Sequence, residues 1–132
     1  MIVDASALVA IVKGEPQAEE ILLCLVSTAS CISSAATFLE ASIVIDALRD
    51  PVLSRKLDEL FEQVPIDISP VTAEHARIAR QAYRDYGRDS GHPANLNFGD
   101  CFSYALAAER RQPLLYVGDD FGHTDIRSAL AS

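Results

Sequence analysis

The stretch NLNFGDCFSYALAAERR, residues 95–111, predicts a helix that begins near an acidic residue and is then apolar for most of its length. Asp100 stands at the expected start, directly after Gly99, and the helix is expected to run to about Arg110. Asp is a favoured helix cap, so Asp100 has an ordinary explanation. It could equally belong to a chemical site. This stretch alone does not decide between the two, but acids elsewhere in the chain bear on the question.

Short apolar runs alternate with helical patterns along the rest of the chain. The expected strands are residues 1–3, 31–32, 66–68 and 114–117. The expected helices are residues 5–12, a segment restarting at 16, and residues 35–49, 51–62, 72–86 and 100–110. Apolar strands that alternate with helices are typical of a parallel sheet covered on both faces. The length of 132 residues fits a single domain, residues 1–132, with a substantial core.

The composition limits the possible functions. The net charge is −8, from 19 acidic residues against 11 Lys and Arg, which makes the chain a poor non-specific binder of nucleic acid. The three Cys and three His show no spacing typical of disulfide frameworks or zinc sites, which indicates a reduced, cytoplasmic protein. The uncharged span 21–39 is long enough to cross a membrane, but Ser and Thr crowd its centre. We therefore expect no membrane segment.

Further acids occupy places where a parallel sheet would gather them. Asp4 follows the first expected strand, and Asp119 and Asp120 follow the fourth, so all of them should reach the same sheet edge. Glu40 lies in an otherwise apolar helix, where a buried carboxylate needs a partner or a cation. Turn chemistry could explain Asp4 and the Gly-Asp-Asp segment, and a water-exposed helix edge could explain Glu40. One shared cluster explains all of these acids together with Asp100.

Such a cluster predicts a bound cation. Several carboxylates cannot sit together ionised without a counter-charge, because like charges raise each other's pKa. Oxygen ligands without Cys or His favour hard ions, hence Mg²⁺ or Mn²⁺. The chemistry that suits these ions beside carboxylates is the hydrolysis of a phosphodiester by water.

Four segments resemble the motifs of a known family. They are MIVDASALVAI (1–11), ATFLEASIVI (36–45), HPANLNFGDCFSYALA (92–107) and PLLYVGDDFGHTDI (113–126). Together they are similar to the four motifs of PIN-domain ribonucleases and, more narrowly, of VapC-type toxins from bacterial toxin–antitoxin pairs. The resemblance implies a three-layer α/β/α sandwich with a mainly parallel central sheet. It also implies a Mg²⁺- or Mn²⁺-dependent endoribonuclease that acts on RNA, a homodimer, and a cognate antitoxin of the VapB type.

The resemblance also assigns roles to the acids. Asp4, Glu40, Asp100 and Asp120 match the catalytic acids of the family, and Asp4, Asp100 and Asp120 would hold the metal. Asp119 stands beside the fourth of these acids and could assist it.

Two other features bear on this interpretation. Ser6 matches a hydroxyl that the family carries two residues after its first acid, and it could equally cap the first helix. Four arginines spaced by three, four and four residues would form one stripe if the helix from Thr72 persists that far. They are Arg77, Arg80, Arg84 and Arg88. The stripe could meet RNA phosphates or simply be a solvated face. The opposite face, expected to pack inward, holds His75, Ile78, Ala79, Ala82, Tyr83 and Tyr86.

Two other classes of function are weighed against the nuclease. A phosphoryl-transfer domain, either a receiver or a haloacid-dehalogenase-like phosphatase, could be built on a similar sheet. Such phosphatases need a second Asp where this chain has Ser6, and receivers need a Lys near the last strand, whereas the lysines here are Lys13 and Lys56. A catalytically silent interaction module is the third possibility, and the presence of all four acids argues against it.

Overall fold

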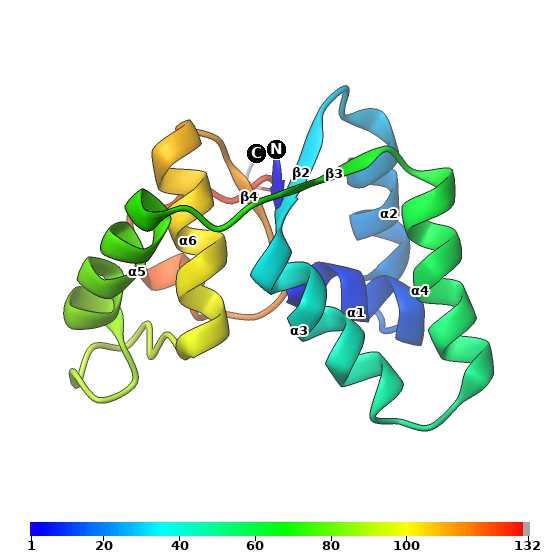
Figure 1. Cartoon of the computed structure of the whole chain (residues 1–132), viewed down its shortest axis with the longest axis horizontal. Helices are drawn as coiled ribbons and strands as arrows, with labels where there is room; N and C mark the ends of the chain where they lie inside the picture. The colour runs from blue at the N-terminus through cyan, green and yellow to red at the C-terminus, as the bar shows by residue number, and fades with distance from the viewer. Residues whose placement is uncertain (131–132) are drawn as a thin grey trace.

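A parallel sheet forms the centre of the molecule. The computed structural model describes residues 1–130, and within them the four-stranded sheet has the order β3-β2-β1-β4, with every neighbouring pair parallel (Figure 1). The strands are β1 (Ile2–Val3), β2 (Cys31–Ser34), β3 (Ile66–Ser69) and β4 (Leu114–Leu115). Ile2 pairs with Ile32 on one side and Leu114 on the other. The parallel arrangement confirms the prediction and places the ends of all strands at one edge.

Helices cover both faces of this sheet. They are α1 (Ala5–Lys13), α2 (Ala18–Ser27), α3 (Ala35–Asp46), α4 (Pro51–Gln63), α5 (Ala73–Tyr86) and α6 (Phe98–Arg110), and a short 3-10 helix, η1 (Phe121–His123), follows β4. In Figure 1, α5 and α6 lie on one side of the sheet and α1 to α4 on the other. The expected three-layer α/β/α sandwich is therefore confirmed. None of the helices in residues 1–130 is both long and apolar enough to cross a membrane.

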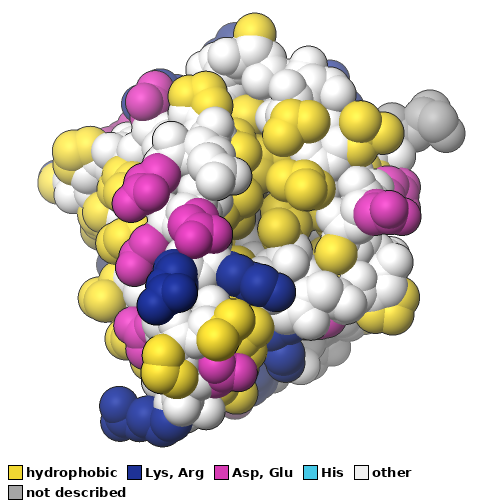
Figure 2. Space-filling model, turned by 90° about the vertical axis from the view of Figure 1, so that its right-hand side faces the viewer, with side chains coloured by type: hydrophobic (Ala, Val, Ile, Leu, Met, Phe, Trp, Pro, Cys, Tyr) yellow, Lys and Arg dark blue, Asp and Glu magenta, His cyan; other side chains and the backbone are white. Residues whose placement is uncertain are grey.

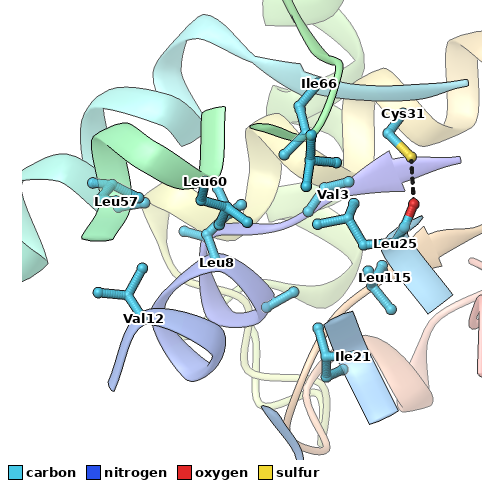
Figure 3. Close-up of a cluster of buried hydrophobic side chains, with 14 of the residues drawn as sticks. Val3, Leu8, Val12, Ile21, Leu25, Cys31, Leu57, Leu60, Ile66 and Leu115 are labelled. Carbon is cyan, nitrogen blue, oxygen red and sulfur yellow. Dashed lines mark hydrogen bonds between the residues drawn. The ribbon is translucent and has the colours of Figure 1, made fainter. Parts of the chain in front are cut away.

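The strand side chains alternate between two buried clusters. Figure 3 shows the cluster beneath α1 to α4, which includes Val3, Leu8, Val12, Ile21, Leu25, Cys31, Leu57, Leu60, Ile66 and Leu115. Ile2, Ile32 and Leu114 point to the opposite face, where they pack with side chains of α5 and α6. Burying a large aliphatic side chain contributes about 1.5–3 kcal/mol. Because both faces are covered, even the two-residue strand β1 is fully buried.

Several predicted boundaries differ from the structure. α3 ends at Asp46 rather than at residue 49, because Arg49 takes a left-handed φ of 56° and Pro51 then begins α4. β4 ends at Leu115 rather than at residue 117. α6 begins at Phe98, two residues earlier than expected.

The arginine stripe predicted along α5 does not include its last expected member, Arg88. The helix ends at Tyr86, so Arg88 lies beyond it, in a segment whose backbone bridges Gly87 to Leu96. The inward face of α5 is only partly confirmed, because Tyr83 keeps 36% of its surface exposed. His75 is buried as expected, with its Nε2 2.8 Å from Glu109 Oε1 on α6.

Candidate active site

The first acid lies at the edge of the sheet where β1 ends. Asp4 is 3% exposed and is the N-cap of α1, with its Oδ2 accepting hydrogen bonds from the Ser6 N–H at 3.0 Å and from the Ser6 hydroxyl at 2.7 Å. The Ser6 hydroxyl in turn accepts from the Val117 N–H at 3.0 Å. Ser6 is therefore not the helix cap. It links the acid after β1 to the segment after β4.

Two buried hydroxyls beneath Asp4 were not identified from the sequence. Ser103 on α6 donates a hydrogen bond to Asp4 Oδ1, and its oxygen lies 3.1 Å from the Thr37 hydroxyl on α3. Both side chains are fully buried. Their positions gave a usable signal, because Thr37 precedes Glu40 by three residues and Ser103 follows Asp100 by three. Residues three apart share a helix face, so each hydroxyl lies on the face of a predicted acid.

Replacing Ser103 with alanine is expected to lower the free energy of unfolding by about 1–3 kcal/mol, because it removes a hydrogen bond from a buried carboxylate and leaves the Thr37 hydroxyl without its partner. Urea denaturation of the variant measures this change. Ser42→Ala is the matched control, since the Ser42 hydroxyl bonds only to Phe38 O of its own helix. Equal losses in the two variants would contradict a special role for Ser103.

Asp100 takes part in a capping box at the start of α6 without being its N-cap. Asn97 is the N-cap and accepts from the Asp100 N–H at 2.9 Å, while Asp100 Oδ2 accepts from the Asn97 N–H at 3.0 Å. One Asp100 oxygen is thus used to hold the helix start. The other has no hydrogen-bond partner in the described chain, so capping and a chemical role are compatible.

Glu40 projects from α3 toward the first turn of α6. Its carboxylate lies so close to the Gly99 backbone that a Cβ at position 99 would overlap it. The missing side chain at Gly99 therefore allows α3 and α6 to approach each other closely. Burial, and then the charges of Asp4 and Asp100, raise the pKa of Glu40 to about 7.

Asp100 experiences the same crowding. Burial raises its pKa to about 6, and the charges of Asp4 and Asp120 add to the increase. The hydrogen bond from Asn97 and the charge of Arg88 lower the pKa, but by less. The start of a helix favours negative charge, and the Asn97 hydrogen bond acts in that direction, but burial outweighs it at Asp100.

The fourth predicted acid lies at the rim of this group. Asp119 and Asp120 are both exposed and follow β4, and Asp120 directly precedes η1. Asp120 is the one of the two whose charge affects Asp100. Acids from four separate segments therefore influence one another at one edge of the sheet. As the side chains are placed, residues 1–130 contain no group of three His, Cys, Asp or Glu arranged to enclose a metal ion.

The donor set nevertheless fits a hard divalent cation. Every candidate ligand is a carboxylate oxygen, the type that Mg²⁺ and Mn²⁺ prefer. Burial is the main cause of the raised pKa values of Glu40 and Asp100, and the negative charges of neighbouring acids raise them further. A cation among these acids would supply the missing charge.

Comparison with known proteins places the chain in a family. Residues 1–127 match the PIN domain. The chain is 55% identical to ribonuclease VapC28 of Mycobacterium tuberculosis over 130 residues and 49% identical to ribonuclease VapC42 of the same species over 129 residues, and each match covers 98% of both chains. The chain therefore belongs to the PIN-domain family. Within it, this is a VapC ribonuclease, the toxin of a toxin–antitoxin system.

Solved structures share the fold. VapC20 of M. tuberculosis, described as a toxin that cleaves the sarcin–ricin loop, matches with a TM-score of 0.73 at 16% identity over 95% of each chain. A toxin–antitoxin complex from Klebsiella pneumoniae matches with a TM-score of 0.71 at 15% identity, over 97% of this chain and 96% of that one. These structures support the α/β sandwich independently of close sequence similarity.

Proposed function

We propose that this ribonuclease hydrolyses RNA phosphodiesters with a divalent cation, Mg²⁺ or Mn²⁺, held by Asp4, Asp100 and Asp120. The observation that carries the proposal is that acids from separate segments converge at one edge of the sheet. The Glu40 carboxylate lies against Gly99, directly before Asp100, and the charge of Asp4 acts on both of these acids. When bound, such a cation neutralises charge and polarises the phosphate.

Side chains of the protein would orient the attacking water, accept its proton and keep the acids in position. Glu40, with a pKa of about 7, is suited to orient a water molecule and accept its proton near neutral pH. Asp4 cannot rotate freely, because Ser6 and Ser103 hold its two oxygens. Attack by water rather than by the 2′-hydroxyl of RNA would leave a 5′-phosphate and a 3′-hydroxyl on the products.

The proposal is tested by incubating the purified protein with total RNA in Mg²⁺, in Mn²⁺ or in EDTA. We expect cleavage with either ion, no cleavage in EDTA, and recovery when excess Mg²⁺ is returned. Sequencing that requires 5′-phosphate ends identifies the product chemistry. Cleavage that persists in EDTA, or products with a 2′,3′-cyclic phosphate, would exclude this mechanism.

The same experiment addresses the other two classes of function. A phosphoryl-transfer domain would form an acyl phosphate on an Asp and leave RNA intact. A silent module would bind RNA or protein without turnover. Ser6 occupies the place where the phosphatases need a second Asp and is fully engaged with Asp4 and Val117, which disfavours the first of these alternatives.

We further propose a VapB-type antitoxin and a second copy of the chain as partners, and the cytoplasm as the location. Support comes from the family and from exposed apolar side chains. Figure 2 shows apolar side chains gathered around a hollow on the face formed by α2 and α4. Leu22, Val26, Leu60 and Val64 line this hollow of about 530 Å³.

A further inference from the structure

Phe98 is an exposed aromatic residue at the edge of the acid cluster. It keeps 79% of its surface exposed, whereas the other phenylalanines of the chain are buried or half-buried. A single exposed apolar residue is ordinary. However, Phe98 is the first residue of α6, and it precedes Asp100 by about 3 Å along the helix axis. Its ring contacts Phe102 edge to face, with centroids 5.0 Å apart.

Phe98 forms one wall of a groove between α5 and α6. The groove has a volume of about 660 Å³, and Ala79, Tyr83 and Phe102 provide much of its apolar lining. α5 and α6 lie side by side in Figure 1. The first residue of α6, Phe98, lines the groove, and Asp100 lies in the same turn of the helix. Asn97, which caps α6 and exchanges hydrogen bonds with Asp100, also lines it. A ligand in this groove would therefore lie directly beside the acid cluster.

Two positive charges border the groove. Arg80 and Arg88 line it, and neither forms a salt bridge within residues 1–130. Arg88 lies near enough to Asp100 for its charge to lower the pKa of that acid. Asp89 also lines the groove, and its carboxylate accepts a hydrogen bond from the Tyr83 hydroxyl at 2.6 Å. In a chain of net charge −8, unpaired arginines at this place are complementary to phosphate.

We propose that the groove is a nucleotide subsite, in which Phe98 stacks on the base next to the scissile phosphate and Arg80 and Arg88 hold the adjoining backbone. This inference rests on the proposed function, because the acids define which phosphate is cut. Stacking requires an unpaired base, so the substrate is RNA that is single-stranded at the cleavage site. A protein segment could also cover Phe98, but unpaired arginines beside an aromatic wall favour a polyanion with flat bases.

The test uses short single-stranded RNAs that carry 2-aminopurine at one position each, because stacking quenches the fluorescence of this base. Binding is measured with Mg²⁺ in an Asp4→Asn background, which the proposed function makes inactive. We expect quenching at one position beside the cleavage site. Phe98→Leu should weaken binding about 5- to 150-fold and abolish quenching, whereas Phe98→Tyr should restore both.

The arginine contribution has a matched control within one helix. Arg80 lines the groove, whereas Arg84, also on α5, does not. Arg80→Gln should reduce the slope of log affinity against log salt by about 1, and Arg84→Gln should leave it nearly unchanged. Equal slopes for the two variants would count against phosphate binding in the groove.

The outcomes separate this inference from the proposed function. RNA cutting by the Asp4→Asn variant would contradict the proposed function. Two results with uncut RNA would overturn the subsite alone. One is equal RNA affinity of the Phe98→Leu and Phe98→Tyr variants, and the other is 2-aminopurine fluorescence that is not quenched at any position. So would a Phe98→Leu variant that loses only its antitoxin binding, because the groove would then be a protein-binding surface.

Discussion

Replacing Asp100 with asparagine is expected to slow RNA cleavage on the order of 10³-fold while the chain keeps its fold. The substitution keeps an oxygen that can accept from the Asn97 N–H, so the capping box at the start of α6 survives. It removes a charge that burial, Asp4 and Asp120 already disfavour, so the stability cost is small. The loss of activity follows from losing one of the charges proposed to hold the cation, which contributes several kcal/mol to the transition state.

Single-turnover cleavage of a defined RNA measures this effect, with circular dichroism to verify the fold. Asp119 and Asp120 provide a matched pair of controls, since both are exposed and adjacent. Because the charge of Asp120 is the one that affects Asp100, Asp120→Asn should lose much more activity than Asp119→Asn. A folded Asp100→Asn variant with nearly normal cleavage would remove Asp100 from the site, and a larger loss at Asp119 would reassign the fourth acid.

The sheet and the acids could be predicted because they depend on strong local patterns. Apolar strands between helices indicate a sheet covered on both faces. An acid that directly follows such a strand must lie at the edge of the sheet where the strand ends. Asp4 shows this most clearly, since the residue that directly follows β1 also caps α1. For Asp100 the sequence predicts the helix and leaves open whether this residue caps it. The structure gives the N-cap to Asn97, three residues earlier, because Asn is an equally good cap.

Contacts between distant segments were not predictable, even where helical spacing places a side chain on the face of a predicted acid. Ser103 and Thr37 meet beneath Asp4 only because α3 and α6 lie against each other at the sheet edge. Arg88 lies beyond the end of α5, so helical spacing does not predict its position. It nevertheless lines the same groove as Arg80, because the chain turns back after α5. The close contact of the Glu40 carboxylate likewise depends on Gly99, which belongs to another helix, α6.

Glu40→Gln is expected to change stability and activity in opposite directions. The pKa of Glu40 is about 7 in the folded chain, against an ordinary value of 4.5. Between pH 4.5 and about 7, the unfolded chain has lost this proton while the folded chain keeps it, so stability without a divalent cation falls as pH rises through this window. Above pH 7 the ionised side chain costs the half-buried site on the order of 1–3 kcal/mol.

Glutamine removes this cost and should stabilise the cation-free chain at pH 8 by about that amount, with little effect at pH 4. Urea denaturation in EDTA at the two pH values measures the difference. In Mg²⁺ the same variant should cleave RNA about 10²- to 10⁴-fold more slowly, because glutamine cannot accept a proton from water. A variant that gains no stability at pH 8 would show that burial and the charges of Asp4 and Asp100 do not raise the pKa of Glu40. A stabilised variant with normal activity would show that the raised pKa of Glu40 serves no catalytic purpose.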